Sequence, residues 1–256
     1  MSRHLFLLRE LVKRDFRGRY TGSLLGFVWS FVQPLWLLLL FSFVFATVLK
    51  VPLVGQRTEN FGLFLFAGLL PWMAIQEGLM RSATAVTDNA PLVKKLAFPS
   101  EILVVAAVLG AVLHELIGLG LFVVVLAVMG ELSPRALPML AVALPLQLVL
   151  TFGGGLLLAA VNVFFRDVAQ LVGMVLTGVF YFTPIVYPLS LVPPPLDRLV
   201  AANPLASLVE LYRIALLGDG PALPPGTAIL AGAGLVLAAG GWWVYRRLQP
   251  GFVDEI

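Results

Sequence analysis

The stretch GFVWSFVQPLWLLLLFSFVFATVL, residues 26–49, contains no charged side chain, and Gln33 and Pro34 are its main interruptions. At a rise of 1.5 Å per residue, a helix of this length reaches roughly 36 Å. The hydrocarbon core of a bilayer is about 30 Å thick, so such a helix crosses it with some tilt. The stretch therefore predicts a transmembrane helix.

Five further apolar runs follow along the chain, at residues 61–79, 102–129, 136–161, 168–187 and 228–245. With the first run they predict an all-α integral membrane protein whose six transmembrane helices lie within residues 25–246. The composition agrees, because 60% of the residues are hydrophobic and 12% are charged, against roughly a quarter charged in a soluble domain. The cysteine count of zero excludes a disulfide-linked secreted domain, thiolate metal sites and cysteine nucleophiles.

The distribution of basic residues predicts the orientation of these helices, since lysine and arginine collect on the cytoplasmic side of membrane proteins. With the N-terminus in the cytoplasm, most of the 17 lysines and arginines fall in cytoplasmic segments. Those left outside are Lys50, Arg57, Arg135, Arg198 and Arg213. We therefore expect both termini in the cytoplasm, with residues 247–256 as a cytoplasmic tail. The basic residues crowd the N-terminus rather than forming a stripe interleaved with aromatics, so nucleic-acid binding is not expected.

Residues 1–24 precede the first span and are predicted to lie along the membrane surface. A helix over residues 2–20 places Leu8 and Val12 on one side and the basic residues Lys13, Arg14 and Arg17 on the other. This pattern is typical of an amphipathic interfacial helix whose basic side meets anionic headgroups. The alternative is a basic anchor that only sets the topology.

A second segment that does not span lies between the fifth and sixth runs. Residues 205–217 are apolar with helical spacing, follow the pair Asn203-Pro204, and are too few to cross a bilayer. They predict a re-entrant or interfacial helix on the outer side. Glu210 and Arg213 are three residues apart and share one face of that helix. An ordinary surface-loop helix is the alternative.

Features of an enzyme are scarce. The cluster Gly153-Gly154-Gly155 lacks the Lys-Ser/Thr of a phosphate loop, and no Gly-x-Ser-x-Gly or His-Glu-x-x-His motif is present. His114 and Glu115 are adjacent and point about 100° apart on a helix, and the chain has two histidines, so a histidine metal site is not expected. We favour interhelical hydrogen bonds for this pair over a proton relay.

Aromatic and polar side chains share faces in two of the predicted spans. In the first span, Trp29, Gln33 and Trp36 fall on one face. In the fifth span, Thr177 and Tyr181 share a face with Gln170, and Phe180 and Tyr187 lie nearby. A helix face of this kind is poorly suited to contact with lipid. It is better suited to line a passage for a substance that has both hydroxyl groups and flat apolar faces. Bundle packing combined with an interfacial aromatic belt is the alternative.

Two segments are predicted to project from the cytoplasmic side. The run Asp88-Asn89-Ala90-Pro91 has the chemistry of a helix start, and a short helix over about 91–96 would present Lys94 and Lys95. The tight turn at 162–167 places two aromatics beside an ion pair. Exposed aromatics next to charges suit a docking surface, and solvated loops are the alternative.

The order of these pieces resembles the membrane subunit of polysaccharide-exporting ABC transporters, of the O-antigen, teichoic acid and capsule type. The matching pieces cover nearly the whole chain in order. They are RDFRGRY (14–20), LGFVW (25–29), QP (33–34), GLLPW (68–72), KKLAFP (94–99), NVFFRD (162–167), FTPIVY (182–187) and NPL (203–205). The NVFFRD and FTPIVY runs are the most specific of them.

The resemblance implies a six-span transport subunit in the cytoplasmic (inner) membrane of a bacterium, without catalytic residues of its own. It implies pairing with a second copy and with two ATPase subunits on separate chains, which would bind ATP and Mg; no cofactor is expected on this chain. The substrate would be a lipid-linked glycan. The residues that the resemblance assigns to ATPase coupling are Thr87, Asp88, Asn89, Pro91, Lys94, Lys95, Phe165, Arg166 and Asp167. Those assigned to a path between the two copies, closed outside by residues 205–217, are Trp29, Gln33, Trp36, Thr177, Phe180, Tyr181 and Tyr187.

Two other functions remain open from the sequence. One is an exporter of the same superfamily that carries a drug or a lipid, for which a more uniformly apolar path is expected. The other is a membrane-embedded enzyme that uses His114 and Glu115.

Overall fold

The structure, a computed structural model, describes residues 2–18, 28–56, 58–95, 99–218 and 223–256. Of residues 2–4, 15–18, 30, 31 and 95 it describes the backbone alone. Throughout these ranges every regular element is a helix, which confirms the all-α prediction. The longer helices are α1 (Ser2–Gly18), α2 (Trp29–Phe41, continued by a π-helical stretch Ser42–Val48), α3 (Phe61–Thr84), α5 (Glu101–Met129), α6 (Ala136–Phe164), α7 (Val168–Phe182), α9 (Pro204–Leu217) and α10 (Thr227–Leu248).

Short helices connect or end these elements. They are α4 (Ala90–Lys95), α8 (Leu196–Ala201), α11 (Phe252–Glu255) and the 3₁₀ turns Thr87–Asn89, Leu189–Leu191 and Gln249–Gly251. Among the described residues, four helical stretches are long and apolar enough to cross a membrane: Phe61–Thr84, Glu101–Met129, Ala136–Phe164 and Thr227–Glu255. The first and fifth predicted spans coincide with the shorter apolar helices Val32–Val48 and Val168–Phe182.

Helix α7 ends at Phe182, earlier than residue 187 where the predicted span ends. The cause is local, because Thr183 precedes a proline and the residue before a proline disfavours the helical conformation. Thr183 is extended, with φ −98° and ψ 133°. Its hydroxyl instead donates a hydrogen bond to the carbonyl oxygen of Val179, at 2.8 Å.

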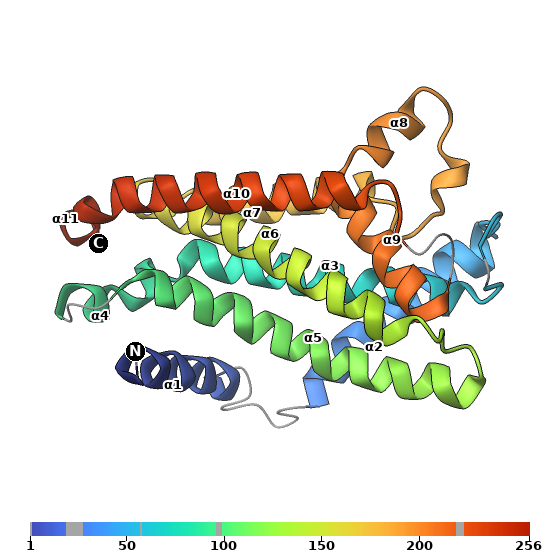
Figure 1. The fold of residues 1–256 in the computed structure, drawn as a ribbon, viewed down its shortest axis with the longest axis horizontal. Coiled ribbons are helices and arrows are strands. Elements are labelled where there is room, and N and C mark those ends of the chain that lie inside the picture. Colours follow the sequence, from blue (N-terminus) through green and yellow to red (C-terminus); the bar gives the residue numbers. More distant parts are fainter. Residues whose placement is uncertain (1, 19–27, 57, 96–98, 219–222) are drawn as a thin grey trace.

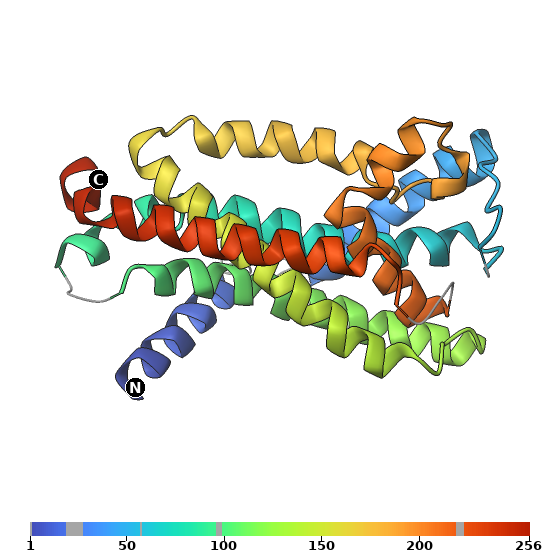
Figure 2. The same ribbon diagram turned by 45° about the horizontal axis from the view of Figure 1, so that its top comes forward.

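The long helices form one elongated bundle, and both chain termini lie at the same end of it (Figure 1). Helices α4 and α11 lie at this end, which we call the termini end, together with the turn between α6 and α7 (Figure 2). Helices α8 and α9 and the connection after α5 lie at the opposite end. The common end of the two termini agrees with the even number of crossings that the sequence predicts.

The C-terminal residues pack against the bundle rather than extending from it. Helix α10 continues to Leu248, and α11 follows after one 3₁₀ turn. Phe252 is fully buried, with its ring 5.2 Å from that of Tyr245 and 6.2 Å from that of Phe164. Within the segment 247–256, expected as a cytoplasmic tail, the side chain of Phe252 therefore packs into the core at the termini end. Burial of one phenylalanine contributes about 1.5–3 kcal/mol.

Helices α6 and α10 pack with their backbones in direct contact. Gly153 lies against the main chain of Ala238 and Leu237, and Gly241 lies against the carbonyl oxygen of Gly153. Any side chain at these positions would meet backbone atoms, which cannot rotate away. Small residues at such crossings are the usual means by which membrane helices approach closely. The glycine cluster in α6 thus serves packing, as expected from the absence of a phosphate-loop motif.

Replacing Gly153 with alanine is expected to lower the stability of the protein in detergent, because the new methyl group forces α6 and α10 apart. Overpacking of this kind costs about 1–3 kcal/mol. The matched control is Gly240→Ala on α10, where the added methyl meets nothing within 4 Å. The measurement is the unfolding midpoint of the purified variants on heating, followed by size-exclusion chromatography. Equal midpoints for the two variants would contradict the packing argument.

Candidate functional site

A cleft of about 500 Å³ opens between α2, α3 and α5. Apolar side chains form most of its wall, including Trp29, Leu37 and Met73. Polar side chains are nevertheless concentrated in it: Gln33, Gln76, Glu77, Arg81, His114 and Glu115. Ionisable groups are rare inside transmembrane segments, where each costs about 2.5–3.5 kcal/mol at the helix centre on insertion scales, and they usually mark a functional site.

Glu77 joins the two long helices that wall the cleft. Its carboxylate oxygen Oε2 lies 3.2 Å from Nδ1 of His114 on α5, and Oε1 lies 3.5 Å from Nη1 of Arg81 on its own helix α3. Glu77 and Arg81 are four residues apart, the spacing that brings side chains together on a helix. The three side chains therefore form a polar cluster between α3 and α5, close to the end of α3.

Glu115 faces a different set of partners from its neighbour His114. Its Oε2 accepts a hydrogen bond from Nε2 of Gln147 on α6, at 2.6 Å, and its Oε1 lies 2.7 Å from the hydroxyl of Tyr212 on α9. The Tyr212 hydroxyl also lies 2.6 Å from Oε1 of Gln147. All three side chains are buried. This ring of contacts holds α5, α6 and α9 together, as the interhelical interpretation of the pair predicts.

The predicted path residues of the first span lie beside this cleft. Trp29 and Gln33 line its wall, and both are exposed in the single chain. Trp36 lies further along α2 and is 63% exposed. Trp29, Gln33 and Trp36 follow one another at steps of four and three residues, so one side of α2 is open for a partner or a substrate.

The predicted path residues of the fifth span are divided between two environments. Thr177 and Tyr181 lie on the exposed side of α7. Phe180 is buried, and its ring lies 5.6 Å from that of Phe41 and 5.5 Å from that of Trp72. Adjacent residues point about 100° apart on a helix, so Phe180 packs inward while Tyr181 faces outward. The Tyr187 hydroxyl donates to the carbonyl oxygen of Tyr181, at 2.9 Å.

Helix α9 begins where the sequence predicts and is more deeply placed than a surface helix. Asn203 caps it, its Oδ1 accepting from the main-chain nitrogen of Leu205 at 3.0 Å, and Pro204 occupies the first turn. Its Nδ2 donates to the hydroxyl of Thr183 at 3.0 Å, which ties α9 to the end of α7. Most side chains of α9 are buried, including all of residues 211–217. A helix that is apolar all round is usually a core helix, and this signal was present in the sequence.

Arg213, which the sequence predicts to lie on the outer side, is buried in the protein core. Its Nη1 donates to the carbonyl oxygen of Pro184 at 2.8 Å and its Nη2 to that of Ile185 at 2.7 Å. The guanidinium lies 3.6 Å from the centre of the Phe64 ring. Glu210, expected on the same helix face, is exposed. The guanidinium of Arg213 therefore joins α9 to residues 184–185.

The first predicted coupling segment forms at the termini end. The turn Thr87–Asn89 leads directly into α4, which begins one residue before the predicted start. Leu96, the predicted end, and the side chain of Lys95 lie outside the described residues. Asn89 is held from two sides, since its Oδ1 accepts from Nη2 of Arg14 at 2.5 Å and its Nδ2 donates to the carbonyl oxygen of Ala85 at 2.8 Å. Asp88, Pro91 and Lys94 are exposed, and Thr87 is partly buried.

The second predicted coupling segment lies at the same end of the bundle (Figure 2). Phe165, Arg166 and Asp167 are all exposed in the turn between α6 and α7. Asn162 shapes this turn by accepting a hydrogen bond from the main-chain nitrogen of Ala169, at 3.1 Å. Helix α11 contacts both α4 and α6. The sequence contained no signal for this third element at the termini end beyond the apolar side chain of Phe252.

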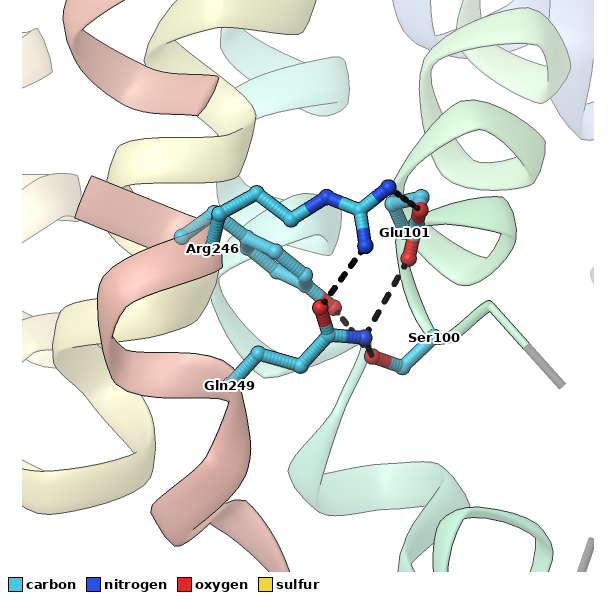
Figure 3. A network of polar contacts seen from close by, with 5 residues as sticks. Ser100, Glu101, Arg246 and Gln249 are labelled. Atoms are coloured by element: carbon cyan, nitrogen blue, oxygen red, sulfur yellow. Dashed lines mark hydrogen bonds and ion pairs between the residues drawn. The ribbon is translucent and has the colours of Figure 1, made fainter. Parts of the chain in front are cut away.

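A polar network secures the helix that follows α4 (Figure 3). Glu101, at the start of α5, forms an ion pair with Arg246 on α10, with 3.2 Å between Oε1 and Nη2. Gln249 donates from Nε2 to the hydroxyl of Ser100 at 3.1 Å, and the Tyr245 hydroxyl donates to the same oxygen at 2.8 Å. The network therefore holds the end of α10 and the 3₁₀ turn after it to the start of α5.

The N-terminal helix α1 packs along α5. Leu11 is buried in a cluster that contains Leu103 and Val104. On the other side Lys13 is exposed and pairs with Glu10, at 2.9 Å, while Arg14 reaches Asn89. The side chain of Arg17 lies outside the described residues. Across the same ranges, no three histidine or acidic side chains are grouped so that they could hold a metal ion.

The sequence profile of the ABC-2 type transporter family matches residues 7–217. The chain is 34% identical over 209 residues to the O-antigen export system permease protein RfbA of Myxococcus xanthus, an alignment that covers 81% of this chain and 78% of that one. It is 29% identical over 253 residues to the protein of the same name from Klebsiella pneumoniae, covering 97% and 94%. It is 23% identical over 214 residues to the polysialic acid transport protein KpsM of Escherichia coli, covering 82% and 81%.

Proposed function

This chain belongs to the ABC-2 type transporter family as a membrane permease subunit, and we propose that it moves a lipid-linked polysaccharide out across the cytoplasmic membrane of a bacterium. It crosses the membrane six times, with both termini in the cytoplasm and α9 re-entering from outside. It pairs with a second copy and with two ATPase subunits, on which ATP and Mg are bound. The chain itself supplies the path and the coupling surfaces.

The cleft between α2, α3 and α5 is the observation that carries this proposal. Sugars present apolar C–H faces, which lie well on aromatic rings, and hydroxyl groups, which need hydrogen-bond partners. Trp29 provides a half-exposed ring, and Gln33, Gln76 and Glu77 provide amide and carboxylate groups in the same cleft. A purely apolar drug or lipid would leave these polar groups of the cleft without hydrogen-bond partners from the substrate. The permease relatives named for O-antigen and polysialic acid support the same substrate class.

The open faces of α2 and α7 suggest where the second copy contributes. Trp36 and Tyr181 each expose more than half of their surface in the single chain. The rings of Phe41 and Phe180 stack between the two helices and hold them side by side. Two copies that meet along these faces would enclose a passage with aromatic walls, and many weak contacts suit a polymer that must slide.

Alanine at Trp29, Trp36 and Tyr181 tests this path. We expect export to slow by roughly two- to tenfold for each replacement, because an aromatic contact contributes about 0.5–1.5 kcal/mol and 1.4 kcal/mol corresponds to tenfold. ATP hydrolysis should persist, since these residues lie away from the predicted coupling segments. The measurement is surface glycan and ATP turnover in the same membranes.

The matched control is Leu39→Ala, which removes an exposed apolar side chain from the same helix α2. It is expected to leave export near the parental rate. Parental export in all three aromatic variants would place the path elsewhere. ATP turnover that responds to drugs or simple lipids, and not to lipid-linked glycan, would overturn the substrate class.

A further inference from the structure

A second, smaller pocket of about 240 Å³ lies between α1, the end of α3, the Thr87–Asn89 turn and α5. Its lining is mainly polar and includes Arg14 from α1, Arg81 and Thr84 from α3, and Asp88 and Asn89 from the turn. Leu103 of α5 contributes to an apolar wall. The pocket is therefore assembled from three elements that follow one another along the chain and from α1, which is distant from them in sequence.

The basic side chains of this pocket suit a phosphodiester. Two guanidinium groups, those of Arg14 and Arg81, enter it from different helices. The carboxylate of Asp88 lies in the same pocket, and that of Glu77 lies 3.5 Å from Arg81 and lines the neighbouring cleft. The two carboxylates balance the two guanidinium charges, so a phosphate would be held by directed hydrogen bonds from both arginines rather than by a net charge. Arginine is also the side chain best suited to paired hydrogen bonds with phosphate oxygens.

The position of the pocket indicates that such a phosphate belongs to a lipid. Arg81 lies in the last turn of α3, one of the helices long enough to cross the membrane, so it is near the level of the headgroups. Helix α1 runs beside α5 close to α4 (Figure 1). Arg81 lines both this pocket and the larger cleft. A lipid whose phosphate lies in the pocket therefore has its remaining parts next to the cleft.

The pocket is also connected to the predicted coupling segment. Asn89, whose Oδ1 accepts from Arg14, immediately precedes α4. A phosphate oxygen that takes the Nη2 donor of Arg14 competes with that contact, because Nη2 is the nitrogen that Asn89 now accepts from. Occupancy of the pocket therefore changes how the start of α4 is held.

We propose that Arg14 and Arg81 bind the phosphate of a membrane lipid in this pocket, and that Asn89 transmits its presence to α4. The inference rests on the proposed function only where that lipid is the carrier of the exported glycan. An ordinary anionic phospholipid offers the same phosphate chemistry, so the experiment uses both kinds of lipid.

Lipid binding to the purified permease in complex with its ATPase partner tests the proposal. The complex is placed in maltoside detergent micelles, which contain no phosphate, with either phosphatidylglycerol or undecaprenyl pyrophosphate as the probe, and the bound lipid is measured by native mass spectrometry. Arg14→Gln and Arg81→Gln are each expected to lower binding of at least one probe by roughly tenfold or more, since a charge-assisted hydrogen bond is lost. Arg9→Gln removes the same charge from an exposed position on α1 and is expected to bind as the parent does.

The outcomes separate the possibilities. If the arginine variants lose binding of phosphatidylglycerol alone, the pocket is a phospholipid site. If they lose binding of undecaprenyl pyrophosphate, the pocket binds the glycan carrier. Equal binding by Arg14→Gln and Arg9→Gln overturns the pocket, and Arg14 suffices for this test if Arg81→Gln fails to fold. If Asn89 transmits occupancy to α4, the probe changes ATP turnover by the parental complex. The Asn89→Ala complex is expected to bind the probe without this change in ATP turnover, and the same change in both complexes overturns the transmission step. A complex that binds lipid through Arg14 but exports no glycan refutes the proposed function alone.

Discussion

Replacing Arg213 with methionine is expected to prevent the protein from accumulating in folded form. The guanidinium of Arg213 donates to the carbonyl oxygens of Pro184, Ile185 and Phe64, at 2.8, 2.7 and 3.4 Å. Methionine fills a similar volume but donates no hydrogen bond, so the buried carbonyl oxygens of Pro184 and Ile185 lose this donor. Leaving a buried acceptor without its partner costs about 1–3 kcal/mol for each group, and two such losses are a large part of a total stability of about 5–15 kcal/mol.

The measurement is the amount of monodisperse protein after extraction, together with its unfolding midpoint. Glu210→Gln is the comparison variant: it removes from an exposed position on the same helix α9 a carboxylate that interacts with Arg213, and it is expected to lower yield and midpoint less than Arg213→Met does. Arg213→Lys keeps the charge but cannot reach all the carbonyls at once, and an intermediate midpoint is expected. Parental yield and stability for Arg213→Met would mean that residues 184–185 are held by other contacts.

Replacing Phe165 with alanine and Lys94 with glutamate is expected to separate ATP hydrolysis from export. Both side chains are exposed at the termini end, Phe165 at 67%, and neither contributes to the buried core. An aromatic side chain at the centre of an interface commonly contributes 2 kcal/mol or more, which corresponds to about thirtyfold in affinity. We therefore expect surface glycan to fall by at least about tenfold while the permease still inserts and remains stable.

Three measurements on the same membranes check this expectation: permease abundance, ATPase subunit recovered with the permease, and surface glycan. The control is Leu137→Ala, since Leu137 is an apolar side chain exposed by 83% at the start of α6, at the opposite end of the bundle. It should leave all three unchanged. Normal export by the double variant would show that the ATPase docks elsewhere, with the C-terminal helix α11 as the next surface to test.

Local sequence determines where most of the helices of this protein begin and end. The apolar runs are too long and too free of charge to be anything except membrane helices, because no soluble surface can be built from them. Asn203-Pro204 starts α9 by capping and by a favourable proline, and Thr183 before Pro184 stops α7. The even number of predicted crossings likewise implies that the two termini share one end. The helix ends depend on residues within a few positions of one another, and the number of crossings depends on counting apolar runs along the chain, so neither requires knowledge of which helices pack together.

Only the tertiary structure decided which faces of those helices meet. Gln147 and Tyr212 lie far from Glu115 along the chain, yet their side chains contact its carboxylate. Phe180 and Tyr181 are neighbours in sequence, and one is buried while the other is exposed. In spans that are apolar on every side, the hydrophobic pattern does not distinguish a face toward lipid from a face toward another helix, because both environments are equally apolar. The side-chain partners are then selected by close packing and by the need of each buried polar group for a hydrogen bond, and both depend on all the helices at once.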